Sequence, residues 1–256
     1  MSTTEVLVHR DADELASAVS ARLMARIVDA QTVRGAASVV LTGGGLGIAV
    51  LRALRESPTR DAIDWSRLDV WWGDERFLPS SDPQRNETQA REALLDAVPL
   101  DPARVHPMPA SDGADGDDPE AAAARYAAEL ARAARPGHEV PHFDVLLLGV
   151  GGEGHIASIF PESPAAYEER AVTAVRGCPK PPPTRISLTF PSITSADEVW
   201  LVAAGAAKAG AIGMALGGAG PVQVPAAGAR GRHRTQWFLD RDAATEVPQT
   251  LRSLRT

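Results

Sequence analysis

One stretch of the sequence constrains the fold more than any other. The apolar run Val145 to Leu148 has the composition of a strand buried on both faces of a parallel sheet. It passes directly into Gly149-Val150-Gly151-Gly152-Glu153-Gly154-His155. Four glycines in six positions let the backbone turn sharply and present main-chain N–H groups at the carboxyl end of the strand, where open α/β sheets bind ligands. The stretch therefore predicts an α/β fold with Glu153 and His155 on a glycine-rich rim.

The same turn also spells G-x-G-x-x-G, the pattern of a dinucleotide site. That site needs a long helix after the last glycine and a strand ending in an acidic residue about twenty positions on. Pro161 and Pro164 follow within ten residues of Gly154, and no apolar strand leads to Glu168 or Glu169. The pattern therefore argues against a nicotinamide site. A catalytic turn and an ordinary polar loop both remain open interpretations at this point.

The composition bounds the class of protein. The 256 residues suffice for one large α/β domain, and no interior linker divides them, so we expect a single domain over residues 1–256. The net charge of −7 argues against a nucleic-acid groove or an anionic membrane surface as the main partner. The single Cys178 fits a reducing compartment, and residues 1–10 lack the pattern of a signal peptide. We expect a cytoplasmic protein, and the spacing of its six histidines predicts no closed metal site.

Alternating strand and helix segments predict one three-layer, Rossmann-like α/β domain with a mainly parallel central sheet. The expected strands are 5–9, 38–42, 68–72, 105–108, 145–148, 171–175, 185–190, 198–203, 222–224 and 235–239. Asp11 or Asp13 is expected to cap a helix with Leu15, Val19, Leu23 and Ile27 on its apolar face. Asn86 is expected to cap another, with Ala90, Leu94 and Leu95 on one side, and further helices are expected at 48–54, 119–134 and 209–216. Residues 111–118 read as an exposed acidic turn, and Tyr126 and Leu130 as core contacts.

A second glycine turn, Gly43 to Gly47, joins an expected strand to an expected helix. Bare N–H groups and the helix dipole make such a junction an anion site, although a tight turn without a ligand is an equal alternative. No Walker lysine is present, which argues against a nucleoside triphosphate. Lys208 stands in the first turn of a later helix, where its charge opposes the dipole unless a phosphate binds there.

Several blocks resemble one enzyme family. LLLGVGGEGHIASIFP resembles the signature of 6-phosphogluconolactonases, usually G-x-G-x-D-G-H-x-A-S-L-F-P, and related glucosamine-6-phosphate deaminases carry a similar segment. WWGDERFLPSSDPQRNE resembles the lactonase block W-G-D-E-R, which the deaminases lack; TGGGLG and KPPPTRISLT resemble two further family blocks. The chain departs from the family at Glu153, where Asp is usual, at Leu46 and Gly47, which replace Thr and Pro, and at Arg85, where Ser is common.

The resemblance implies hydrolysis of 6-phospho-D-glucono-1,5-lactone to 6-phospho-D-gluconate in the pentose phosphate pathway, without a cofactor. An imidazole suits the general base that this chemistry needs, so we expect His155 to activate water and Glu153 to orient its ring. Arg76 lies close to the site by resemblance. The residues expected to bind the substrate and its phosphate are Thr42, Gly43, Gly44, Gly45, Lys180, Arg185 and Lys208.

Two other functions stay open. One is a glucosamine-6-phosphate deaminase or sugar-phosphate isomerase, against which the W-G-D-E-R block speaks. The other is a non-catalytic sugar-phosphate-binding protein, which usually carries a DNA-binding domain for which this chain has no spare length. In each case the partner is a small molecule, and we expect no nucleic acid, membrane or obligatory protein partner.

Overall fold

The computed structural model describes residues 2–252. The single domain expected over residues 1–256 therefore extends past the described residues at both ends. Among those residues no helix is long and apolar enough to cross a membrane.

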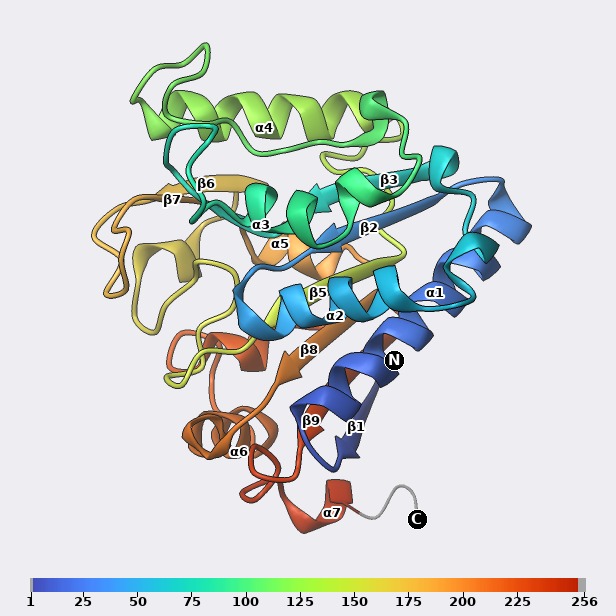
Figure 1. The fold of residues 1–256 in the computed structure, drawn as a ribbon. Coiled ribbons are helices and arrows are strands. Elements are labelled where there is room, and N and C mark those ends of the chain that lie inside the picture. Colours follow the sequence, from blue (N-terminus) through green and yellow to red (C-terminus); the bar gives the residue numbers. More distant parts are fainter. Residues whose placement is uncertain (1, 253–256) are drawn as a thin grey trace.

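A central sheet of six strands forms the middle of the molecule (Figure 1). Its order is β1-β9-β8-β5-β2-β3, and every neighbouring pair is parallel. The strands are β1 (Thr3–His9), β2 (Ala37–Leu41), β3 (Leu68–Trp72), β5 (Val145–Gly149), β8 (Glu198–Ala203) and β9 (Arg234–Asp240). The mainly parallel α/β fold expected from the sequence is confirmed.

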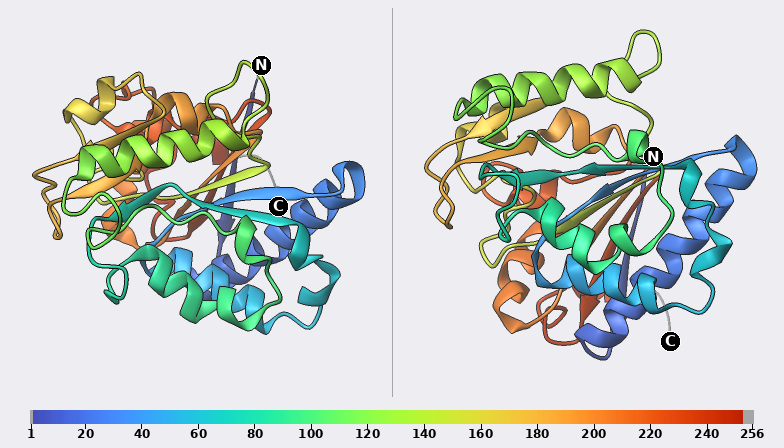
Figure 2. Two further views of the ribbon diagram at one scale, coloured as in Figure 1. Left: turned by 90° about the horizontal axis from the view of Figure 1, so that it is seen from above. Right: turned by 45° about the horizontal axis from the view of Figure 1, so that its top comes forward.

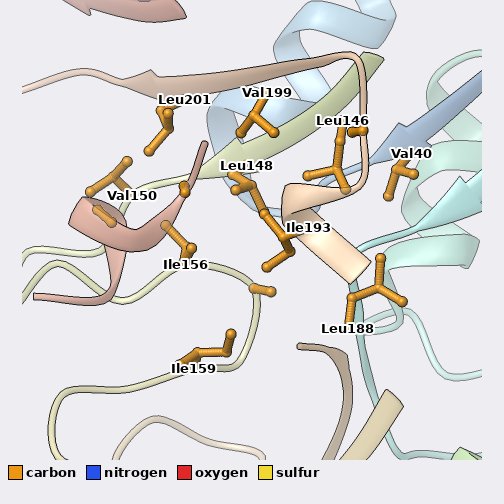
Figure 3. Close-up of a cluster of buried hydrophobic side chains, with 14 of the residues drawn as sticks. Val40, Leu146, Leu148, Val150, Ile156, Ile159, Leu188, Ile193, Val199 and Leu201 are labelled. Carbon is orange, nitrogen blue, oxygen red and sulfur yellow. The ribbon is translucent and has the colours of Figure 1, made fainter. Parts of the chain in front are cut away.

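Both faces of this sheet are covered, which gives three layers (Figure 2). Val39 and Leu41 of β2 face one core cluster and Val40 faces the other, as the two-residue period of a strand requires. Helices α1 (Ala12–Arg34), α2 (Gly44–Glu56) and α3 (Asn86–Ala93) cover the first face; α4 (Pro119–Ala133), α5 (Phe190–Thr194) and α6 (Ala209–Leu216) cover the second, and α7 (Gln249–Arg252) ends the described chain. Figure 3 shows part of the second core cluster, in which Ile193 of α5 lies among Leu146, Leu148 and Val199.

A second, smaller sheet branches from the first. It has the order β4-β7-β6 and is antiparallel, with strands β4 (Asp74–Arg76), β6 (Val172–Val175) and β7 (Arg185–Leu188). Gly73 joins the two sheets, because its N–H donates to Leu41 O at 3.0 Å while its carbonyl accepts from Leu188 N at 2.8 Å. The strands expected at 171–175 and 185–190 thus exist in shortened form, but outside the parallel sheet.

Several local expectations are confirmed. The Asp11 carboxylate accepts from Glu14 N at 2.9 Å and caps α1. The apolar face of α1, expected from Leu15 and every fourth residue to Ile27, is buried. Tyr126 and Leu130 are fully buried in the core, and most of the acidic turn at 111–118 is exposed.

Other expectations are wrong. Val105 forms only an isolated bridge with Val70, and residues 222–224 form a turn, in which Val224 N donates to Gly220 O. Helix α2 begins at Gly44, four residues before the expected start. Asn86 is the first residue of α3, not its cap, because the Glu75 carboxylate accepts from the backbone N–H groups of residues 86 and 87. The helix ends at Ala93, so the expected Leu94 and Leu95 lie beyond it.

Candidate active site

A cavity of about 440 Å³ opens at the carboxyl edge of the central sheet. The loops after β2, β5 and β8 form one side of it, and strands β4 and β7 of the small sheet form the other. Among its lining residues are Thr42, Gly43, Gly44, Gly45, Asp74, Arg76, Asn86, Gly149, Gly151, His155, Arg185 and Lys208. Most of the residues expected from sequence to form the site are therefore brought together.

His155 is held on three sides. Its Nδ1 lies 3.0 Å from Oε1 of Glu153, and its ring stacks on Phe160 with the centroids 4.5 Å apart. Against the ring lies Gly151, where an added Cβ would come within 1.9 Å of Nδ1, so only glycine fits. An Nδ1–H that donates to Glu153 leaves Nε2 of the neutral ring as a proton acceptor.

Burial of the imidazole favours its neutral form. Burial lowers the pKa of His155 below its ordinary value, and the Glu153 carboxylate raises it again only in part. Burial acts to raise the pKa of Glu153, but the hydrogen bond from Lys180 and the charge of His155 bring it to about 2. At neutral pH the site thus pairs an ionised carboxylate with an imidazole that is free to accept a proton.

The small sheet supplies two guanidinium groups to the cavity. Arg76 and Arg185 are directly opposite each other in the β4–β7 register, and both line the cavity. Arg76 donates from Nη1 to Gln84 O, and its buried Nε has no hydrogen-bond partner among the described residues. Like charges directly opposite on neighbouring strands are destabilising. The arrangement therefore favours an anion in the cavity.

The glycine loop after β2 lies on the other side of the cavity, at the start of α2. The Thr42 hydroxyl accepts from Gly149 N at 3.1 Å and so joins this loop to the loop of His155. Gly44 has a φ of +80°, and a Cβ added at Gly44 or Gly45 would meet no atom within 4 Å. No acidic residue stands in the first turn of α2. Its N-terminal N–H groups can therefore donate hydrogen bonds to an anion in the open cavity.

Lys208 adds a cation at the start of α6. Its side chain is partly buried and lines the same cavity. Burial lowers the pKa of its ammonium group, and the charge of Lys180 acts in the same direction. A phosphate bound nearby would offset this desolvation.

Sequence reasoning assigned no role to Asp74 and used Asn86 only for its spacing and as a helix cap. Asp74 is buried and its Oδ2 accepts from Ser158 Oγ at 2.7 Å, while Arg185 Nη1 lies 3.7 Å from the same oxygen. Asn86 Nδ2 donates to Asp74 O at 2.8 Å, and its buried Oδ1 lies against Gly43 without a hydrogen-bond partner within residues 2–252. Asp74 belongs to the W-G-D-E-R block and Asn86 to the segment that follows it, so the resemblance of this block to the family could have indicated both residues.

Two expected site residues do not line the cavity. Glu153 stands behind His155, and Lys180 contacts Glu153, with Nζ 2.8 Å from Oε2. Arg185 lines the cavity but also holds the loop of Lys180, since its side chain donates to the carbonyls of residues 180, 181 and 182.

A group of metal-ligating side chains lies at the opposite edge of the central sheet. It consists of His142, Asp144 and Asp197, just before β5 and β8. The guanidinium of Arg34 already contacts the Asp144 carboxylate. The group is thus far from the cavity along the strands, and the absence of a metal from the reaction stays a prediction.

Comparisons with known proteins agree on one family. Residues 10–237 match the family model described as glucosamine-6-phosphate isomerases/6-phosphogluconolactonase. A Streptomyces coelicolor protein described as a 6-phosphogluconolactonase is 63% identical over 252 residues, which are 97% of each chain. One from Mycobacterium tuberculosis is 51% identical over 247 residues, 96% of this chain and 99% of the other.

Solved structures show the same fold. The 6-phosphogluconolactonase from Trypanosoma brucei superimposes with a TM-score of 0.82 at 27% identity, covering 97% of this chain and 100% of the other. A monomeric glucosamine-6-phosphate deaminase gives a TM-score of 0.77 at 21% identity, covering 94% and 99%. The second likeness is one of fold alone.

Proposed function

This chain belongs to the family of glucosamine-6-phosphate isomerases and 6-phosphogluconolactonases, and on that premise we propose that it hydrolyses 6-phospho-D-glucono-1,5-lactone to 6-phospho-D-gluconate. The reaction is a step in the oxidative branch of the pentose phosphate pathway. The observation that carries the proposal is the His155–Glu153 contact at the wall of a cavity that also contains Arg76 and Arg185. Identities of 63% and 51% to proteins described as 6-phosphogluconolactonases support the choice of substrate.

The chemistry begins with a proton transfer to His155. A lactone is an activated ester, so water can open it once a base with a pKa near or below neutrality removes a proton. Nε2 of His155 takes that proton while the water oxygen forms a bond to the lactone carbonyl carbon. The bond from this carbon to the ring oxygen then breaks, and the imidazolium returns its proton to the ring oxygen. Glu153 stabilises the imidazolium between the two transfers.

The remaining groups bind charge. We assign backbone N–H groups of the glycine loops as the hydrogen-bond donors to the negative charge that develops on the carbonyl oxygen. We assign the 6-phosphate to Arg185, Lys208 and the N–H groups of Gly44 and Gly45, which line the same cavity. Arg76, opposite Arg185 on β4, adds positive charge near the reacting end or the phosphate.

The expected setting follows from composition. A net charge of −7 and a single cysteine support a cytoplasmic enzyme that acts on a small molecule, without a nucleic acid, a membrane or an obligatory protein partner. The proposed reaction needs no cofactor, because the base, the nucleophilic water and the cationic groups suffice for ester hydrolysis.

Two assays run side by side test the proposal. Freshly prepared phosphogluconolactone should release protons faster with the enzyme than by spontaneous hydrolysis, and glucosamine 6-phosphate should release no ammonia. Ammonia release without acceleration of lactone opening would assign the chain to the deaminases instead. Failure of both assays with a protein that binds 6-phosphogluconate would leave a non-catalytic sugar-phosphate-binding protein.

A further inference from the structure

Lys180 occupies a place that the sequence does not predict. Its Nζ lies 2.8 Å from Oε2 of Glu153, while Oε1 of the same carboxylate lies 3.0 Å from Nδ1 of His155. One carboxylate therefore joins the ammonium group to the imidazole, with a separate oxygen for each. Neither Lys180 nor Glu153 lines the cavity.

Hydrogen bonds within the chain hold the loop of Lys180. Arg185 donates from Nη2 to the carbonyls of Lys180 and Pro181 at 3.2 and 3.1 Å, and from Nε to Pro182 O at 3.1 Å. Cys178 N also donates to Pro183 O at 2.9 Å across the base of the loop. Because the backbone is held and rich in proline, the lysine loses less conformational freedom when it pairs with Glu153.

The residue at position 153 suits this double contact. The family signature usually has Asp here, and Glu153 is one methylene longer. The extra length carries the carboxylate farther from the glycine turn, where it meets the loop of Lys180 as well as the imidazole.

We propose that Lys180 is a positioning residue that holds the Glu153 carboxylate against His155, and that it is not a ligand of the substrate phosphate. The inference rests on the proposed lactonase function. It assigns the phosphate to Lys208, Arg185 and the start of α2, and leaves Lys180 to act on the base through Glu153.

The charges around His155 give this role a measurable signature. Three charged groups act on the imidazole: Glu153 from the same turn, Lys180 from the proline loop and Asp74 from β4. Three cations line the same cavity: Arg76 of β4, Arg185 of β7 and Lys208 at the start of α6. Lys180 acts to lower the pKa of His155, and Glu153 acts to raise it. Removal of the ammonium group should therefore raise the pKa of His155, and removal of the carboxylate should lower it. Shifts of opposite sign report the charges of the two groups at the imidazole, so they are read together with the fall in kcat, which reports the positioning of the carboxylate.

The test uses Lys180→Met, which keeps the aliphatic side chain, with Lys180→Arg as the conservative variant. Arg125→Met is the matched control, because it removes one positive charge from an exposed pair, 2.6 Å from Asp115, outside the cavity. The kcat of Lys180→Met should fall about two- to five-fold, as expected for a partly exposed ion pair. KM for the phosphorylated lactone should stay unchanged, and the acidic limb of kcat/KM should move to higher pH. Lys180→Arg should restore both values, and Arg125→Met should match wild type.

A titration of the His155 imidazole by NMR separates this inference from the proposed function, since it needs no substrate. A higher His155 pKa in Lys180→Met supports an action of the ammonium group on the base even if the natural substrate is another lactone, and the fall in kcat at unchanged KM supports the positioning role. An unchanged His155 titration, together with a raised KM for the phosphorylated lactone but not for glucono-1,5-lactone, would make Lys180 a phosphate ligand and overturn the inference. Unchanged titration with unchanged kinetics would overturn it as well.

Discussion

The central parallel sheet and the small antiparallel sheet contribute different chemistry to the same cavity. At the rim of the central sheet, glycine turns after β2 and β5 present backbone N–H groups, and the second turn carries His155 and Glu153. The small sheet presents charged side chains instead. Arg76 and Arg185 lie opposite each other, and Asp74 Oδ2 lies 3.7 Å from Nη1 of Arg185. In this account one region performs the proton transfers, and the other adds the positive charge that favours an anionic substrate.

Because the two sheets contribute different groups, variants in each should change different quantities. Changes at the rim of the central sheet should lower kcat, because the base acts in the transition state. Changes among the cations should weaken substrate binding or destabilise the fold. These groups pair with the phosphate of the substrate or with a buried carboxylate, and both are charged in the ground state as well as in the transition state.

The largest expected effect is that of His155→Ala. Loss of the base should lower kcat by roughly 10²- to 10⁴-fold, with little change in KM. The measurement is proton release from phosphogluconolactone, corrected for spontaneous opening. A kcat near that of wild type would show that His155 is not the general base.

In the small sheet, Arg185→Met should mainly reduce stability. The change leaves the buried Asp74 without its nearest cation and frees the carbonyls of the proline loop. The free energy of unfolding should fall by about 3 kcal/mol, as for other buried pairs that lose one partner. Denaturant unfolding monitored by circular dichroism measures this. A variant as stable as wild type that binds 6-phosphogluconate normally would contradict both roles given to Arg185.

Lys208→Ala tests whether all the substrate-binding cations belong to the small sheet, because Lys208 follows β8 of the central sheet, at the start of α6. The variant should weaken binding of the phosphorylated substrate by about 1.5 to 3 kcal/mol, the range of a charge-assisted hydrogen bond. Inhibition by 6-phosphogluconate should weaken in parallel, and a lactone without phosphate should be little affected. Equal losses on both lactones would place Lys208 away from the phosphate.

The smallest expected effect is that of chelation. The proposed chemistry uses side chains and backbone groups from the two sheets only, so exhaustive treatment with a chelator should leave kcat/KM unchanged. A folded but inactive metal-free preparation that recovers with added zinc would show that a metal contributes to the reaction.

The same comparison explains how much the sequence could predict. All strands of the central sheet except the edge strand β1 are largely buried on both faces, so continuous runs such as Val145 to Leu148 identify them, and β3 and β8 were predicted to the residue. The pattern of Arg185 to Leu188 also indicates a strand, but it does not say that its partners are β4 and β6. The β4–β7 pairing joins segments far apart in the sequence, and it places Arg185 opposite Arg76.

The site was predictable in a similar way. His155 and Glu153 lie two residues apart in one turn, and their chemistry suggested the pair. The contact between Glu153 and Lys180 joins residues 27 positions apart, and nothing local to either one indicates it. The prediction of a strand at 222–224 was wrong because Pro221 and Pro225 flank a segment too short for a strand.

The central claim is that Glu153 supports His155 as the base, and the pH dependence of kcat/KM in wild type and Glu153→Gln tests it most directly. The imidazole must be neutral to accept a proton, so activity falls as the pH drops through the pKa of His155. That pKa is already lowered by burial, and loss of the Glu153 carboxylate should lower it further. The account predicts a smaller maximum in Glu153→Gln and an acidic limb that lies at lower pH than in wild type. An acidic limb at the same pH in both proteins would contradict it.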